Sequence, residues 1–245
     1  MKVISLLPAR IGSNRVILKN LRLLNSKPLI SYNIETLKKS AIGNDVYINS
    51  DSEIFHEIAN QNNINFYHRK KELATSSSLI DDYLYDFMTN VECDYLAVVN
   101  PTSPFINVEF INSAWSKIIA ANADTLLSYE KIQTHCFIDD KPINFTTKSK
   151  HPRSQDLEPV KALNFAISIW KVDTFIESYV KNGHGVYSGN IVFHETEGWA
   201  NIDIDYEEDF QFAEMAARFL ESNSNYEKQY TDEAKEILKT RDPRT

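Results

Sequence analysis

The sequence predicts an α/β fold with a mostly parallel sheet and helices on both faces. Over the first 130 residues, short apolar runs alternate with segments of helical spacing, which is the pattern of βαβ units. The composition is 42% hydrophobic and 24% charged, as in folded globular proteins rather than disordered chains. Together these observations indicate a Rossmann-like sheet.

The expected strands are Val3–Leu7, Asp45–Asn49, Asn65–His68, Tyr95–Val99 and Thr125–Tyr129. Helical spacing between them predicts helices at Pro28–Lys39, Glu53–Asn62, Leu79–Met88 and Val108–Ala121. In open α/β sheets, ligands bind beyond the carboxyl ends of the strands. The segments after Leu7, Asn49 and Val99 are therefore the first candidates for a functional site.

The pattern changes at about Glu130. Residues 130–199 consist of hairpin-like pieces, with a turn at Asp139–Lys141 and an apolar strand at Leu163–Trp170. We expect a small inserted subdomain that acts as a lid or a dimerisation arm. Helical spacing returns at Asp203–Leu220, so residues 1–222 are expected to form one domain, and residues 223–245 a charged tail.

The net charge, the cysteines and the N-terminal segment argue against several classes of function. The net charge of −8 argues against binding to nucleic acid or an anionic membrane, because both require excess Lys and Arg. Cys93 and Cys136 lie far apart, without disulfide-framework or zinc spacing. The N-terminal apolar run is too short for a signal peptide, and no run is long enough to span a bilayer. A cytoplasmic protein is expected.

The segment after the first predicted strand is rich in cations. It carries Arg10, Arg15 and Lys19 around Gly12 and Ser13. Such a loop can wrap a triphosphate with backbone N–H groups and cationic side chains. It has a single glycine, so it is neither a Walker A loop nor a dinucleotide fingerprint. On residue types alone, an ordinary charged surface loop is an equal alternative.

Asp203 and Asp205 stand two residues apart. On a strand both carboxylates would face one side, where they could hold Mg²⁺ that bridges nucleotide phosphates. The alternative is a pair of carboxylates capping the following helix, together with the acidic residues Glu207, Glu208 and Asp209. Residue types alone favour the cap.

Seven motifs occur in a fixed order along the chain. They are Pro8–Asn20 followed by Lys27–Ile30, then Asn49–Glu53, Arg69 with Glu72–Ala74, Asn100–Pro104, Arg153–Leu157, Asn164 with Ala166, and Ile202–Asp205 with Glu208–Phe210. This series, from Pro8 to Glu214, resembles the acylneuraminate cytidylyltransferases, the CMP-sialic acid synthetase family. The resemblance implies transfer of CMP from CTP to the anomeric hydroxyl of an acidic 2-keto-3-deoxy sugar, with release of pyrophosphate, for surface glycan synthesis. It also implies a Mg²⁺ cofactor and a homodimer.

The resemblance also implies roles for individual residues. It implies that the nucleotide is bound by Arg10, Gly12, Ser13, Arg15, Lys19, Asn20, Arg69, Ser78 and Asn100. By the same resemblance, Asp203 and Asp205 hold the metal, and together with Arg10 and Lys19 they form the catalytic group. The expected acceptor-binding residues are Ser103, Arg153, Gln155, Asn164 and Phe165. Arg153 is the candidate partner of the acceptor carboxylate, because its planar fork matches two carboxylate oxygens.

The chain departs from the family pattern at several positions. Asn14 stands where the family has Lys, Ile17 where it has Pro, and Asn100 where it has Gln. Phe165 replaces a Gly, which predicts a different acceptor, such as a pseudaminic, legionaminic or heptulosonic relative. Two other functions stay open: a GT-A-like glycosyltransferase, and a non-catalytic relative that binds nucleotide.

Overall fold

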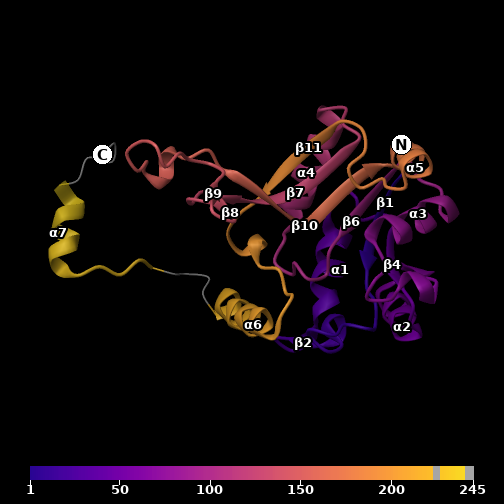
Figure 1. Ribbon diagram of the computed structural model, residues 1–245. Helices are drawn as coiled ribbons and strands as arrows, with labels where there is room; N and C mark the ends of the chain where they lie inside the picture. Colours follow the sequence, from indigo (N-terminus) through magenta and orange to yellow (C-terminus); the bar gives the residue numbers. More distant parts are fainter. Residues whose placement is uncertain (223–226, 241–245) are drawn as a thin grey trace.

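The computed structural model describes residues 1–222 and 227–240. Within them, a seven-stranded sheet has the order β11-β7-β10-β6-β1-β4-β5 (Figure 1). The strands are β1 (Val3–Pro8), β4 (Val46–Ser50), β5 (Asn65–His68), β6 (Tyr95–Val99), β7 (Thr125–Ile132), β10 (Val160–Lys171) and β11 (Ile191–Thr196). Only β10 is antiparallel to its neighbours. The expectation of a mostly parallel sheet is confirmed.

Helices cover both faces of this sheet, as expected. Apart from Leu29, the buried apolar side chains of α1 (Leu29–Lys39), α2 (Glu53–Asn62) and α4 (Val108–Ala120) pack in one core cluster. Those of α3 (Ile80–Asn90) and α5 (Val172–Asn182) pack on the opposite face. The elements expected before residue 130 begin and end within two residues of their predicted bounds, apart from β7, which runs further to Ile132.

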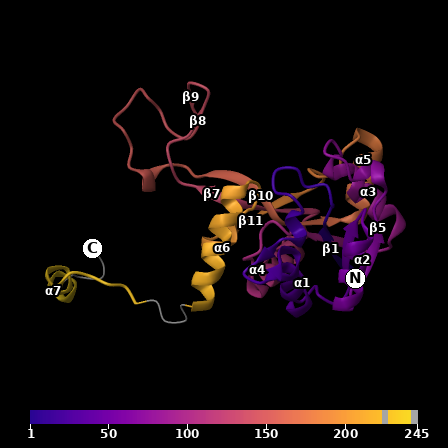
Figure 2. The same cartoon turned by 90° about the horizontal axis from the view of Figure 1, so that it is seen from below.

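Residues 130–199 contribute more to the main sheet than the hairpin pattern predicts. They supply β10 and β11 to the main sheet, together with the unpredicted helix α5. Only residues 133–159 project as an arm (Figure 2), with a small hairpin of β8 (Phe137–Ile138) and β9 (Lys141–Pro142). The helix was missed because α5 follows β10 directly, without a turn signal between them.

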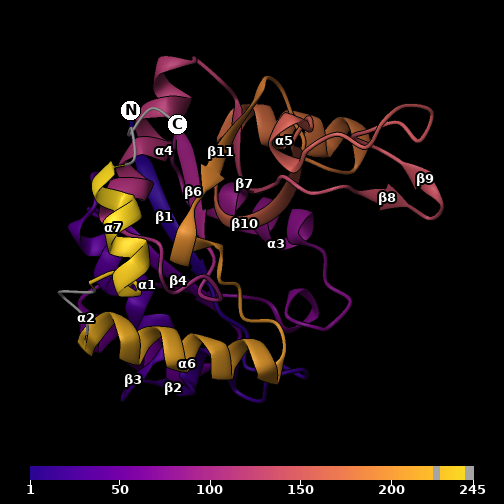
Figure 3. The same cartoon turned by 90° about the vertical axis from the view of Figure 1, so that its left-hand side faces the viewer.

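Helix α6 (Glu207–Ser222) begins four residues later than the helical spacing from Asp203 predicts. It packs beside the short hairpin of β2 (Leu23–Leu24) and β3 (Lys27–Pro28) (Figure 3). Within the predicted tail, the described residues form helix α7 (Asp232–Thr240), and residues 223–226 and 241–245 lie outside the described part. None of the helices in the described ranges has the length and apolarity needed to cross a membrane.

Four 3₁₀ turns complete the described elements: η1 (Lys19–Leu21), η2 (Lys71–Leu73), η3 (Ser154–Asp156) and η4 (Gly198–Asn201). Of these, η1 and η2 lie beside the carboxyl end of the sheet, where β1 and β5 lead into loops. The segment that connects η4 to α6 brings residues 202–206 back to the loop after β6, since the N–H of Ile204 donates to the carbonyl of Thr102 at 2.9 Å. Distant parts of the chain therefore meet at this edge of the sheet.

Candidate functional site

A cavity of about 700 Å³ opens at the carboxyl ends of β1 and β6. Its walls come from the loop after β1, the segment between β5 and α3, strand β10 and residues 203–205. Most of the site residues expected from the sequence line it: Arg10, Ser13, Arg15, Lys19, Asn20, Arg69, Ser78, Asn100, Asn164, Phe165, Asp203 and Asp205. Residues separated by nearly 200 positions thus form one site.

Four expected site residues do not line this cavity. Gly12 lies at the exposed tip of the loop, and Ser103 is 1% exposed behind the cavity wall. Arg153 and Gln155 lie on the projecting arm, Gln155 within η3 and Arg153 directly before it, and Arg153 makes two hydrogen bonds to Asp156, of 2.7 and 3.0 Å. The structure does not bring these two residues to the cavity of their own chain.

The cationic loop points its charges inward. Leu18 has a left-handed backbone (φ 51°), after which η1 directs Lys19 into the wall, 8% exposed. The Lys19 ammonium donates to the carbonyl of Ile204 and lies 3.4 Å from Asp205. Burial lowers the pKa of Lys19, and the Asp205 carboxylate opposes this shift. Asn14, at the position of the family's fourth cation, also lines the cavity.

Arg10 and Arg15 approach the cavity from the same loop. The Arg10 guanidinium donates to the carbonyl of Thr75 at 2.8 Å, which ties the loop after β1 to the segment after η2. Arg15 donates to Asp205 at 2.8 Å and lies over the ring of Tyr206. Arg10, Arg15 and Lys19 therefore all line the cavity, and Arg15 and Lys19 meet at Asp205. Their positive charges would stabilise an anionic ligand.

The two aspartates are available to the cavity rather than to helix α6. The N–H groups of Asp205 and Tyr206 donate to the Asp209 carboxylate at 2.9 and 2.7 Å, so Asp209 caps the helix. The segment 202–206 is extended but pairs with no strand, which corrects the strand assumed for the pair. Burial raises the pKa of Asp203, and a hydrogen bond from Thr102 opposes this shift.

Asp203 and Asp205 fit a Mg²⁺ ion that is shared with a ligand. Oδ1 of Asp203 is buried and has no hydrogen-bond partner, and an unpaired buried oxygen is unfavourable without a ligand. In the described part of the chain, no cluster of three or more His, Cys, Asp or Glu residues could hold a metal by itself. Mg²⁺ commonly takes one or two protein carboxylates and completes its shell with phosphate and water.

The part of the cavity wall that β10 forms is neutral and partly aromatic. Strand β10 changes register between Leu163 and Ser168, and Phe165 at this bulge has a φ of 53°. The amide of Asn164 bonds Ser128 at 2.8 Å and Thr196 at 2.7 Å, so it holds the bulge in place. The phenylalanine therefore occupies a conformation that favours glycine.

Sequence reasoning missed several cavity residues. Tyr83 and Ile80 of α3 line the cavity, as do Val98 and Ser168. Ser168 is 2% exposed and its hydroxyl has no partner. The signal for Ser168 was present, because a serine interrupts the otherwise apolar run Ile167–Trp170. Tyr83 gave no signal, since an aromatic residue on an amphipathic helix normally belongs to the core.

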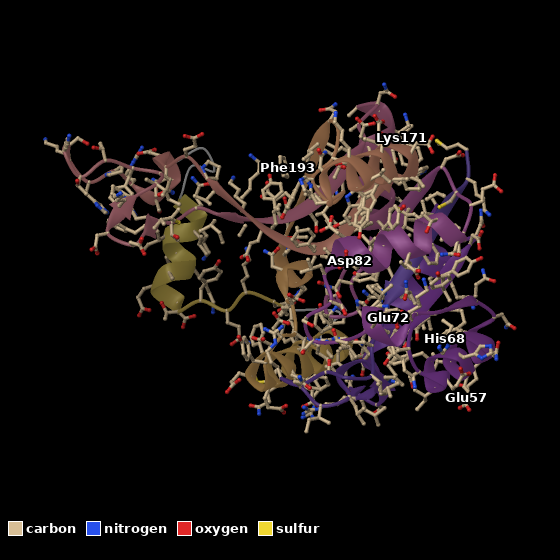
Figure 4. The ribbon with its side chains drawn as sticks, turned by 45° about the vertical axis from the view of Figure 1, so that its right-hand side comes forward. Glu57, His68, Glu72, Asp82, Lys171 and Phe193 are labelled. Atoms are coloured by element: carbon tan, nitrogen blue, oxygen red, sulfur yellow. The ribbon has the colours of Figure 1, made fainter. Side chains whose placement is uncertain are left out.

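Ser78 shapes the segment between β5 and α3. Its hydroxyl donates to the carbonyl of Glu72 at 2.9 Å and accepts the N–H of Thr75 at 3.0 Å. Figure 4 labels Glu72 in this segment and Phe193 on β11.

The backbone of Asn100 is held in place through its carbonyl, which accepts a hydrogen bond from the side chain of Asn33 at 2.9 Å.

Comparison with known proteins finds relatives of similar sequence. The chain is 26% identical over 246 residues to an N-acylneuraminate cytidylyltransferase of Streptococcus agalactiae, covering 94% of this chain and 58% of the relative. It is 27% identical over 181 residues to a pseudaminic acid cytidylyltransferase of Campylobacter jejuni, covering 68% and 76%. The chain thus spans little more than half the length of the streptococcal relative.

A solved structure shows the same fold. The CMP:2-keto-3-deoxy-manno-octonic acid synthetase in complex with CTP has a TM-score of 0.67 at 14% identity, covering 89% of this chain and 99% of that one. Residues 4–162 match the profile of a family described as cytidylyltransferase. This match covers more than half of the chain and includes the whole cationic loop, and on this basis the protein belongs to the cytidylyltransferase family.

Proposed function

We propose that this protein transfers CMP from CTP to the anomeric hydroxyl of an acidic, sialic-acid-like sugar. The observation that carries the proposal is a single cavity whose wall combines the cations Arg10, Arg15 and Lys19 and the two aspartates with a neutral stretch of β10 around Phe165. We expect the triphosphate to bind at the cations and the sugar ring beside β10. Relatives named for sialic, pseudaminic and legionaminic acids support this acceptor class.

The reaction is a displacement at the α-phosphorus. The anomeric oxygen forms a new P–O bond and loses its proton, while the bond to pyrophosphate breaks. Mg²⁺ held by Asp203 and Asp205 would neutralise charge on the phosphates when it is bound. Lys19, fixed by Ile204 and Asp205, provides a positioned cation for the charge that develops during displacement. The protein mainly orients the reactants.

Phe165 is the residue of this chain that we propose to restrict the acceptor. Because its φ is positive, a glycine at this position relieves about 1–2 kcal/mol of backbone strain. Phe165→Gly should therefore be more stable than Phe165→Ala, the reverse of the usual order inside a strand. Denaturant unfolding of both variants measures this difference.

The same pair of variants tests acceptor choice. Phe165→Gly should improve the use of N-acetylneuraminic acid relative to a smaller 2-keto-3-deoxy acid, because the benzyl group occupies part of the cavity. Suppose the unmodified enzyme already prefers N-acetylneuraminic acid and the glycine variant leaves the ratio unchanged. Phe165 would then have no part in acceptor choice.

We also propose a homodimer formed through the arm. Phe137, Ile138 and Ile143 are between 45% and 63% exposed there, and apolar side chains gathered on a projecting hairpin are typical of an interaction surface. Sedimentation at micromolar concentration should show a dimer, and Ile138→Asp should shift it to monomer. A monomer in the unmodified protein would contradict this proposal. A dimer would also explain how Arg153 and Gln155 meet a cavity, namely that of the neighbouring copy.

Pyrophosphate release tests the proposed function. The protein should release pyrophosphate from CTP, and not from ATP, GTP or UTP, when given an acidic 2-keto-3-deoxy sugar and Mg²⁺. A GT-A-like glycosyltransferase would release none from any triphosphate. Binding of CTP without release of pyrophosphate across a panel of acidic sugars would identify a non-catalytic relative. Asn14 and Phe165, which depart from the family pattern, are the reason to consider this alternative.

A further inference from the structure

Arg69 is a buried cation whose hydrogen-bond partners are neutral. It follows β5 directly and is 4% exposed. Its Nε donates to Oδ1 of Asn49 at 2.6 Å, and its Nη2 donates to the Asn49 carbonyl at 3.1 Å. The guanidinium carbon lies 4.1 Å from the ring centroid of Tyr83. Within residues 1–222 and 227–240, no salt bridge joins Arg69 to a carboxylate.

The charge of Arg69 remains available to the cavity. Burial lowers the pKa of Arg69, while the charge of Asp51 acts in the opposite direction without forming an ion pair. Asp51 instead accepts the backbone N–H of Ile11 at 3.3 Å. No hydrogen bond joins Nη1 of Arg69 to another group in the described ranges, and the residue lines the cavity. The remaining donors are therefore free to meet a ligand.

Asn49 is not the side chain that would stabilise this cation best. It is fully buried, and its Nδ2 has no hydrogen-bond partner. An aspartate has nearly the same shape and would give Arg69 a counter-ion. A buried cation without a counter-ion is unfavourable, so the neutral amide leaves the folded protein with an uncompensated charge beside the cavity.

We propose that Asn49 is a positioning residue that holds Arg69 by neutral acceptors, so that the guanidinium keeps its full charge for an acceptor group of the bound nucleotide. Asn49 fixes one edge of the guanidinium, and the ring of Tyr83 fixes its plane. Carbonyl oxygens, unprotonated ring nitrogens and phosphate oxygens are groups that such a donor recognises. This inference rests on the proposed binding of CTP.

The test is Asn49→Asp, measured for thermal stability and for CTP binding by calorimetry. The new carboxylate should pair with Arg69, so the melting temperature should equal or exceed that of the unmodified protein. CTP should bind about tenfold more weakly or worse, because the charge offered to the nucleotide is neutralised. In turnover assays, KM for CTP should rise while kcat changes little. A residue with a merely structural role would not separate stability from binding in this way.

Two variants serve as controls. Asn33 is also fully buried, and its Nδ2 donates to the carbonyls of Asn100 and Ser103, whereas no hydrogen bond in the described ranges joins its side chain to an arginine. Asn33→Asp should lower the melting temperature, which shows that a buried aspartate is not stabilising in general. Asn49→Leu removes the side-chain acceptor without adding charge and should lower both the melting temperature and CTP affinity.

The outcomes separate this inference from the proposed function. If the unmodified protein binds no CTP, the proposed function fails and the inference with it. If the unmodified protein binds CTP and Asn49→Asp binds it equally well, only the inference is wrong. It is also wrong if Asn49→Asp loses stability and affinity together, as Asn49→Leu does. Should Asn49→Asp fail to fold, that loss of stability likewise contradicts the expected ion pair.

Discussion

Replacing Asp203 by Asn should reduce turnover by on the order of 10²–10³-fold, because a positioned charge at the transition state is lost. The fold should survive. The Asp203 carboxylate is buried with one oxygen unpaired, so its charge opposes folding rather than favouring it. Assays across a Mg²⁺ titration provide the measurement. Near-normal Mg²⁺-dependent activity in both Asp203→Asn and Asp205→Ala would contradict the metal assignment.

The carboxylate of Asp203 should also make the stability of the unmodified protein depend on pH. The pKa of Asp203 is raised above its ordinary value of 3.8 by burial. The folded state therefore holds this proton more tightly than the unfolded state, and its contribution to stability is lost as pH rises from about 3.8 through the folded pKa. Unfolding free energies in the absence of metal should show this decline in the unmodified protein, and Asp203→Asn should lack it.

Lys19→Ala should lower kcat by about 10²-fold while weakening CTP binding much less, because charge at the α-phosphate grows only on the way to the transition state. The side chain is fixed by Ile204 and Asp205, so its ammonium is already oriented. Single-turnover kinetics combined with CTP binding separates the two effects. Weaker binding with unchanged turnover would place Lys19 at the distal phosphates instead.

A matched control for the loss of a cation is Lys27→Ala. Lys27 pairs with Glu35 at 2.7 Å and does not line the cavity. This variant changes the net charge by the same amount as Lys19→Ala. Its kcat should be unchanged, which would exclude a general electrostatic effect of removing one positive charge.

The sheet could be predicted from the sequence because its signals are local. Elements such as β1 and β6 carry their own hydrophobic runs and boundaries. The helix α5 was not predicted, since the strand pattern of β10 continues directly into it. The order β11-β7-β10 depends on pairing between distant segments, which no local pattern specifies.

The site could be predicted where its residues lie close together in the sequence. The loop from Arg10 to Lys19 reaches the cavity as expected, and Asp203 and Asp205 join it. Arg153 and Gln155 do not reach the cavity of their own chain, because the direction of the arm is set by how far β7 and β10 extend together, through Ile132 and Val160. Local spacing does not encode that extension.

The contact of Asn49 with Arg69 could not be predicted from the sequence either. The two residues are twenty positions apart and meet because β4 and β5 are adjacent and parallel, with Asn49 opposite Tyr67. Each lies in a motif that the sequence reveals. Their pairing, and the missing counter-ion, become visible only when the strands are placed side by side.

The central claim is that the anomeric oxygen of an acidic sugar attacks the α-phosphorus of CTP. Its most direct test is mass spectrometry of the product made from CTP and an acceptor labelled with ¹⁸O at the anomeric hydroxyl. The account predicts a CMP-sugar that retains the label in the oxygen bridging carbon and phosphorus, together with unlabelled pyrophosphate. A product in which the label is absent from this bridge, or a sugar attached without cytidine monophosphate, would contradict it.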